Sequence, residues 1–220
     1  MLPRVSDDEE PSPAMSQAAE LQHPASGAEE FDFGAKVSSS GKLGMWIFLL
    51  TDAMSFGGLL LGYAILRSGS HDWPDPSQRL GIPFTAGMTF ILICSSVTMV
   101  MALAAAQEKN KKGLLLWLGL TILGGVMFLC GQAKEYTSLI SEGAGITVDN
   151  MWATFFIPTG FHGLHVFTGV TYLSVIWVQS ARGKYTDGPN ASANNIEIAG
   201  LFWHFVDLVW ILVFTFIYLI

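Results

Sequence analysis

The sequence predicts an all-α integral membrane protein, a bundle of five transmembrane helices that follows a disordered, acidic N-terminal tail. Of its 220 residues, 51% are hydrophobic and only 13% are charged, whereas about a quarter of the residues in a soluble domain are charged. The apolar residues gather in five long runs, and the excess of acidic residues precedes the first run. These features favour lipid rather than water as the solvent of the folded chain.

The predicted tail comprises residues 1–41. Residues 1–35 hold eight acids, one base and four prolines, so they account for the whole net charge of −7. A segment of this composition cannot bury enough apolar surface to fold by itself. We therefore expect a disordered tail on the cytoplasmic side, and a docking segment for a partner subunit is the alternative.

The predicted transmembrane domain comprises residues 42–220. A spanning helix needs about 20 mostly apolar residues. Five segments meet this requirement: 43–66, 83–106, 113–131, 152–179 and 197–219. Polar stretches separate them, among which residues 132–151 form the break after the third span.

The basic residues that flank the spans are unevenly divided between the two sides. One side has seven Lys or Arg residues, and the other has three, which are Arg67, Arg79 and Lys134. Because loops rich in Lys and Arg stay in the cytoplasm, the sequence predicts a cytoplasmic N-terminus and a C-terminus on the outer side.

Five ionisable side chains lie near the middle of three predicted spans. At about 1.5 Å per residue, similar depths are reached by Asp52, His162, His165, His204 and Asp207. An isolated charge at this depth costs on the order of 3 kcal/mol, so these groups must pair, face water or be neutral. The two histidines of the fourth span share a helix face, and so do His204 and Asp207.

We interpret these groups as a buried hydrogen-bond network that holds the helices together. Asp52, one fourth-span histidine and Asp207 are expected to form one cluster, directly or through water. Proton conduction and metal or haem ligation are the alternatives, but the fourth span lacks the Glu-x-x-His pattern of di-iron bundles. Cys94 and Cys130 have no nearby cysteine partner, which excludes a cysteine-ligated centre. The protonation state of Asp52 stays open.

Glycines near these groups predict close contacts between helices. Gly58 and Gly62 form a GxxxG pattern in the first span, and Gly160 and Gly163 surround the fourth-span histidines. For the first span, packing within this chain is favoured over packing on a partner subunit.

The fourth and fifth spans also carry two specific strings. Residues 159–166 read TGFHGLHV, and residues 203–210 read WHFVDLVW. They resemble the TGFHGLHV and WHFVDVVW signatures of subunit III of haem–copper oxidases, and the resemblance extends over residues 42–220. This chain resembles the five-span bacterial form. The buried acid of the first span is often Glu in that family and is Asp52 here.

The resemblance implies an accessory subunit with no redox centre of its own. Such a subunit lies beside catalytic subunit I and subunit II in the bacterial cytoplasmic membrane, and those partners hold the haems and copper. It binds phospholipid in a cleft, protects the catalytic subunit from inactivation and supports proton uptake. By position, the family motifs match Asp52, His162, His165, Trp203, His204 and Asp207, with Gln132, Glu135, Glu197 and Trp210 in support. No nucleic acid partner is expected.

Other assignments stay open at this point. The sequence does not decide between a cytochrome c oxidase and a quinol oxidase, because other subunits choose the electron donor. It also does not decide whether the complex joins a larger respiratory supercomplex. An accessory subunit of a nitric oxide reductase is a related alternative. A stand-alone proton channel or transporter is a rival of another class, although the matched, broken helices typical of transporters are absent.

Overall fold

The computed structural model describes residues 40–70, 73, 81–187 and 193–220. The chain divides into two units, Met1–Ser40 and Gly41–Ile220, and the helices described below belong to the second. Residues 1–39, where the acidic tail is predicted, lie outside the described residues.

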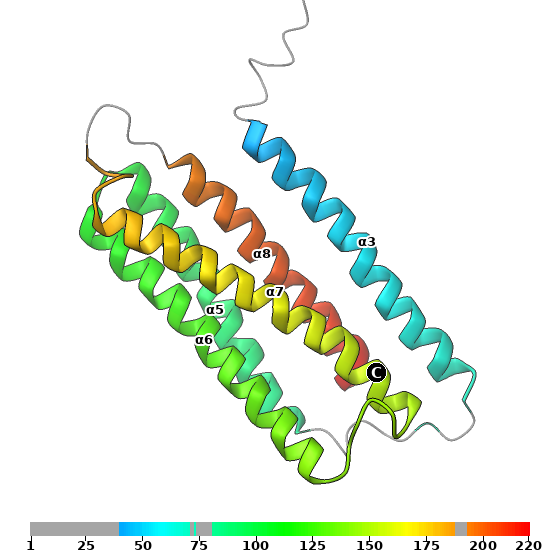
Figure 1. Ribbon diagram of the computed structural model, residues 1–220. Coiled ribbons are helices and arrows are strands. Elements are labelled where there is room, and N and C mark those ends of the chain that lie inside the picture. Colours follow the sequence, from blue (N-terminus) through cyan, green and yellow to red (C-terminus); the bar gives the residue numbers. More distant parts are fainter. Residues whose placement is uncertain (1–39, 71–72, 74–80, 188–192) are drawn as a thin grey trace, which may run out of the picture. The chain divides into compact units, whose positions relative to one another are not determined.

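Five long helices make up the described part of the chain (Figure 1). They are α3 (Ser40–Ser68), α5 (Ile82–Gln107), α6 (Lys111–Ser141), α7 (Asn150–Ala181) and α8 (Asn194–Phe214), which continues into the π-helical turn η1 (Thr215–Leu219). Each is long and apolar enough to cross a membrane, and the described residues include no strand. The predicted fold class is confirmed: the chain is a multi-pass, all-helical membrane protein.

The third spanning helix is longer than its apolar run suggests. Helix α6 ends at Ser141, whereas the predicted span ends at residue 131. The additional turns carry Gln132 and Glu135, both of which are buried. Their polar atoms find hydrogen-bond partners on other helices, described below, so burial does not leave them unsatisfied. Hydropathy alone predicts that the helix ends before such polar residues.

Helices α5, α6, α7 and α8 form a closely packed four-helix bundle, in which α5 and α7 each contact both α6 and α8. Trp203 of α8 occupies the centre and is 1% exposed. A Cβ atom on Gly125 of α6 would lie 2.6 Å from the Trp203 ring, and one on Gly169 of α7 would lie 3.0 Å from it. The indole fits because both positions lack a side chain, and its Nε1 donates to Ser95 Oγ at 3.1 Å.

A second tryptophan, Trp210, is buried about two turns further along α8. Its Nε1 donates to Thr89 Oγ1 at 2.9 Å, and the Phe128 ring meets it edge-on with centroids 4.7 Å apart. The indole N–H groups of both tryptophans are thus satisfied inside the bundle, as buried indoles require.

Helix α3 packs against the bundle along one narrow seam. Its buried side chains are Leu49, Asp52, Phe56 and Tyr63, a spacing that places them on one helix face. The contacts of α3 with α7 and α8 involve long side chains, such as Phe56 with Phe161 at 4.9 Å. Close backbone contacts are concentrated among the other helices, so α3 is joined to the bundle at a few points only.

Candidate functional site

The buried carboxyl group of α3 meets a histidine of α7. Asp52 Oδ1 lies 3.2 Å from His165 Nε2, and the two side chains are 7% and 12% exposed. The other ring nitrogen, His165 Nδ1, lies 2.7 Å from the Phe161 carbonyl oxygen. Because a carbonyl oxygen can only accept, Nδ1 carries a hydrogen and donates it. Both residues lie near the middle of their helices, and hence near mid-membrane depth.

This geometry determines how many protons the pair holds. With Nδ1 as donor, a neutral imidazole presents only a lone pair at Nε2. The contact with Asp52 therefore needs one more proton, either on His165 Nε2 facing a carboxylate or on the carboxyl group facing the imidazole. The pair is electrically neutral in both forms, which lowers the cost of placing it in hydrocarbon.

Two phenylalanines cover the pair. The ring centroid of His165 lies 5.3 Å from that of Phe56 on α3 and 4.6 Å from that of Phe161 on α7. These rings fill the space around the imidazole and add apolar contact between α3 and α7. The pair is consequently a shielded polar contact inside an aromatic patch.

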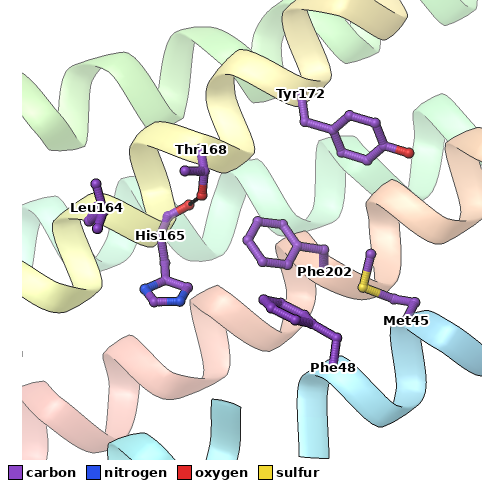
Figure 2. A pocket seen from close by; sticks show the side chains of 7 residues that line it. All are labelled: Met45, Phe48, Leu164, His165, Thr168, Tyr172 and Phe202. Carbon is purple, nitrogen blue, oxygen red and sulfur yellow. Dashed lines mark hydrogen bonds between the residues drawn. The ribbon is translucent and has the colours of Figure 1, made fainter. Parts of the chain in front are cut away.

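A groove of about 450 Å³ opens beside His165, between α3, α7 and α8. Its lining is shown in Figure 2 and comprises Met45, Phe48, Leu164, His165, Thr168, Tyr172 and Phe202. The Thr168 hydroxyl donates to the His165 carbonyl at 2.9 Å, so it leaves the groove wall largely apolar. Phe48 of α3 and Phe202 of α8, with ring centroids 6.1 Å apart, meet in the wall of the groove.

His162, one turn before His165, lies in a different environment. It is 0% exposed and packs on Trp210, with ring centroids 4.8 Å apart and planes at 31°. Phe128 meets it edge-on at 5.5 Å. Neither ring nitrogen of His162 has a hydrogen-bond partner among the described residues. His162 is therefore an aromatic core residue here, and no described hydrogen bond joins it to Asp52.

His204 and Asp207 belong to a second polar group, between α5 and α8. His204 Nδ1 lies 2.6 Å from Ser96 Oγ, and the Asp207 carboxyl group lies near the same hydroxyl group. Asp207 Oδ1 is enclosed and has no partner among the described residues. Direct contacts in the described chain therefore divide the predicted cluster into two groups, Asp52 with His165 and Ser96 with His204 and Asp207.

Two polar residues of the supporting motif tie α6 to its neighbours. Glu135 accepts from Thr85 Oγ1 on α5 and from Tyr218 Oη on η1, each at 3.0 Å. Gln132 Nε2 donates to the Thr159 carbonyl on α7 at 2.7 Å. The π-helical turn η1 carries Tyr218 and so contributes one of the two hydroxyl groups that bind Glu135.

The remaining member of the supporting motif lies at one end of the bundle. Glu197, in the first turn of α8, forms a salt bridge with Lys42 Nζ, and the two charged atoms lie 2.7 Å apart. This ion pair is partly exposed, at 22% for Lys42 and 40% for Glu197. It is a second point at which α3 is joined to α8.

The predicted packing glycines behave differently on α7 and α3. A Cβ atom on Gly163 would lie 2.6 Å from Gln132 Oε1 of α6, and Gly160 also lies against α6. Around Gly58 and Gly62, by contrast, no described atom beyond the adjoining backbone of α3 lies within 4 Å of the Cβ position. The expected packing of this pair inside the chain is not seen, because the seam that α3 turns toward the bundle contains its large side chains instead.

Sequence reasoning missed the hydroxyl groups that partner the acids and histidines. These are Thr85, Ser96 and Tyr218. The Ser95–Ser96 pair in the middle of the second span is the one local signal. Hydroxyl groups in helices often bond to their own backbone carbonyls, so their presence alone does not indicate a partner on another helix.

Metal-ligating residues do not converge in the described part of the chain. No group of three or more His, Cys, Asp or Glu side chains there could hold a metal ion. Cys94 and Cys130 are free and exposed.

Comparisons with known proteins show the family to which the chain belongs. A family model described as cytochrome c oxidase subunit III matches residues 27–220. The chain is 37% identical to the cytochrome c oxidase subunit 3 of Corynebacterium diphtheriae over 181 residues. The aligned region covers 81% of this chain and 87% of that protein.

Two other relatives extend the comparison. The cytochrome c oxidase subunit 3 of Thermostichus vulcanus is 35% identical over 180 residues, 81% of this chain and 86% of that protein. A probable quinol oxidase subunit 3 of Staphylococcus saprophyticus is 32% identical over 195 residues, 88% of this chain and 95% of that protein. The chain therefore belongs to the cytochrome c oxidase subunit III family, and it is a subunit III of a haem–copper oxidase.

Proposed function

We propose that this subunit III serves a cytochrome c oxidase of a bacterial cytoplasmic membrane, together with catalytic subunit I and subunit II. Its proposed role is to stabilise the catalytic subunit, to hold a phospholipid and to support proton uptake, while the haems and copper lie in the partner subunits. The observation that carries this proposal is the apolar groove between α3 and the bundle, with His165, the partner of Asp52, in its wall.

The groove has the chemistry of a site for a lipid acyl chain. Its wall is formed almost entirely by apolar side chains, and Tyr172 adds a hydroxyl-bearing ring. Lys42 lies one helical turn before the groove residue Met45 and forms a salt bridge with Glu197, so that end of the groove lies beside a pair of charged side chains. An acyl chain would fill the space that the point contacts of α3 leave open, and would thereby stabilise α3 against α7 and α8.

Filling the groove tests this role. Leu164 and Phe167 of α7 are exposed to similar degrees, 57% and 58%, but only Leu164 lines the groove. We expect Leu164→Trp to remove one phospholipid from the purified complex in native mass spectrometry, and Phe167→Trp to retain it. Equal lipid content in the two variants would contradict lipid binding in this groove.

The proposed support of proton uptake is indirect. The Asp52–His165 pair carries one shared proton, yet no described hydrogen bond continues from it toward either end of the bundle. Because the pair joins α3 to α7, its contribution is to position α3 and the groove beside the catalytic subunit. The alternative, in which Asp52 itself carries protons, is separated from this one by the Asp52 variants described in the Discussion.

The electron donor is tested by activity of the whole complex. Relatives named as cytochrome c oxidase subunits and one named as a probable quinol oxidase subunit have similar identity to this chain, 35–37% against 32%. We expect the purified complex to oxidise reduced cytochrome c. Oxidation of a quinol and not of cytochrome c would assign the chain to a quinol oxidase.

Assembly is tested by purification through a tag on this chain. We expect the purified material to show the absorption spectrum of a haem protein and to contain copper, and the isolated chain to contain neither. Stoichiometric iron or copper in the isolated chain would refute the proposal. Proton flux through liposomes that contain only this chain would support the rival reading of a stand-alone channel.

The proposed orientation places the N-terminus in the cytoplasm, on the basis of seven against three flanking basic residues. A C-terminal alkaline phosphatase fusion should then be active, because this enzyme matures only outside the cytoplasm. An inactive phosphatase, together with an active cytoplasmic reporter at the same position, would reverse the orientation.

A further inference from the structure

The surface between α5 and α8 carries a histidine nitrogen that the described chain does not satisfy. We define the α5/α8 face by Ile93, Ser96 and Val100 on α5, and His204, Leu208 and Ile211 on α8. His204 is half-buried, and its Nδ1 is held by Ser96. His204 Nε2 has no hydrogen-bond partner among the described residues, and it is not among the enclosed polar atoms. This nitrogen therefore faces outward from the bundle.

His204 lies at a depth where lipid offers no hydrogen-bond partner. Ser96 lies near the middle of α5, and His204 lies near the middle of the span Asn194–Leu219. The hydrocarbon core of a bilayer is about 30 Å thick and offers neither donors nor acceptors, so an unpaired polar group there is costly. Ile93, Val100 and Leu208 around it are 40%, 54% and 57% exposed, as expected for a face inside the membrane.

The need for a partner does not depend on the histidine tautomer. If the Ser96 hydroxyl donates to Nδ1, the ring hydrogen lies on Nε2, which then requires an acceptor. If Nδ1 instead carries the ring hydrogen and donates to Ser96 Oγ, Nε2 presents a lone pair that requires a donor. In both cases the outward nitrogen of His204 calls for a polar group from outside this chain.

Two exposed hydroxyl groups on the membrane surface differ from His204 in this respect. Thr51 donates to the Phe48 carbonyl at 2.8 Å, and Thr171 donates to the Phe167 carbonyl at 2.9 Å. Such hydroxyl groups are satisfied by their own helix and tolerate lipid. His165 is likewise satisfied at both nitrogens, by Asp52 and by the Phe161 carbonyl.

We propose that the α5/α8 face docks on a transmembrane helix of a partner subunit, and that this helix presents a hydrogen-bonding side chain to His204 Nε2. The proposal rests on the function proposed above, since it requires an oxidase complex. A lipid acyl chain fits the apolar rim but cannot pair with the nitrogen.

Photocrosslinking in the assembled complex tests the face directly. A benzophenone amino acid replaces Leu208, or replaces Leu123 of α6 as a control of similar exposure, 57% against 53%, and similar depth. We expect the probe at Leu208 to give a covalent adduct with a partner polypeptide, identified by mass spectrometry. Lipid adducts alone at Leu208, in a complex that shows the haem spectrum, would overturn the proposal.

Two substitutions separate docking from a purely internal role of His204. His204→Asn places an amide near the position of Nδ1 and keeps the contact with Ser96, but loses the outward group. His204→Gln places its amide near the position of Nε2 and keeps the outward group. We expect His204→Asn to lower the haem recovered per tagged chain by about fivefold, the size of one interhelical hydrogen bond in a membrane, and His204→Gln to stay near the wild-type value.

The thermal stability of the full-length chain in detergent gives the second readout. His204→Asn should match the wild type here, because the internal contact with Ser96 remains. If His204→Asn assembles normally while His204→Gln does not, the histidine acts inside the chain and the docking proposal fails. If no haem at all copurifies with the tagged wild-type chain, the proposed function fails together with this inference.

Discussion

The four-helix bundle α5–α8 and the single helix α3 hold their positions by different means. In the bundle, glycines let large aromatic side chains approach neighbouring backbones, as Trp203 does against Gly125 and Gly169. Helix α3 instead touches α7 and α8 through the side chains of a narrow seam, with one mid-membrane pair and one terminal ion pair. The bundle is the more closely packed part of the subunit, and α3 forms one wall of an apolar groove.

This difference shows how a membrane subunit can keep a lipid-sized space without losing its fold. Lipid solvates apolar surface as well as protein does, so there is little hydrophobic driving force to pull α3 onto the bundle. Its position then depends on a few polar and aromatic contacts. Substitutions in the bundle should accordingly cost more stability than substitutions along the α3 seam, and the following predictions test that ranking.

The largest effect is expected in the bundle, for Gly125→Leu. A Cβ atom at this position would lie 2.5 Å from Val170 Cγ2 and 2.6 Å from the Trp203 ring, so the helices must move apart. We expect a loss of at least about 2 kcal/mol in the free energy of unfolding, measured by denaturation of the purified chain in detergent. Gly58→Leu is the matched control, because no described atom beyond the adjoining backbone of α3 lies within 4 Å of its Cβ position; equal losses in both variants would erase the distinction between bundle and α3.

A smaller effect is expected at the α3 seam, for Asp52→Leu. The substitution leaves His165 Nε2 without its partner in an apolar environment. We expect a loss of about 1–2 kcal/mol in stability and a lower yield of assembled complex. Denaturation in detergent and the haem recovered per tagged chain measure the two effects. An unchanged yield would mean that the pair does not hold α3 in place.

Asp52→Asn sharpens this prediction by keeping the hydrogen bond. The amide nitrogen of Asn can donate to His165 Nε2 while His165 Nδ1 continues to donate to the Phe161 carbonyl. If the pair is structural, the variant complex should assemble and turn over nearly as fast as the wild type. Strongly reduced turnover in a well-assembled Asp52→Asn complex would show instead that Asp52 carries protons.

The five-helix fold could be predicted from the sequence because each spanning helix is indicated by residues close together in the chain. Runs of apolar residues predict the five spans, and each predicted segment falls within one described helix. The depth of Asp52 and His165 follows from counting residues along these spans. The extra length of α6 was not accessible, because Glu135 stays helical and buried only with hydroxyl groups from Thr85 and Tyr218, which lie far away in the sequence.

The partners of the buried polar residues could not be predicted from the nearby sequence. His162 and His165 lie one turn apart on α7, yet His165 meets Asp52 whereas His162 packs on Trp210. Which of the two reaches α3 depends on the rotation of α7 about its axis, and that rotation is set by packing in the whole bundle. The same reason explains why a GxxxG pattern at Gly58 does not reveal whether its face meets this chain or another one.

The smallest effect along α3 is expected at its terminal ion pair, for Glu197→Gln. Lys42 and Glu197 are partly exposed, at 22% and 40%, so solvent and salt screen their attraction. We expect the substitution to lower the free energy of unfolding by less than about 1 kcal/mol, and the difference from the wild type to shrink further at high salt. Denaturation of the purified chain at low and at high ionic strength measures both quantities. A loss larger than that of Asp52→Leu would place the main attachment of α3 at the end of the helix, where its first turns meet α8, and not at the mid-membrane pair.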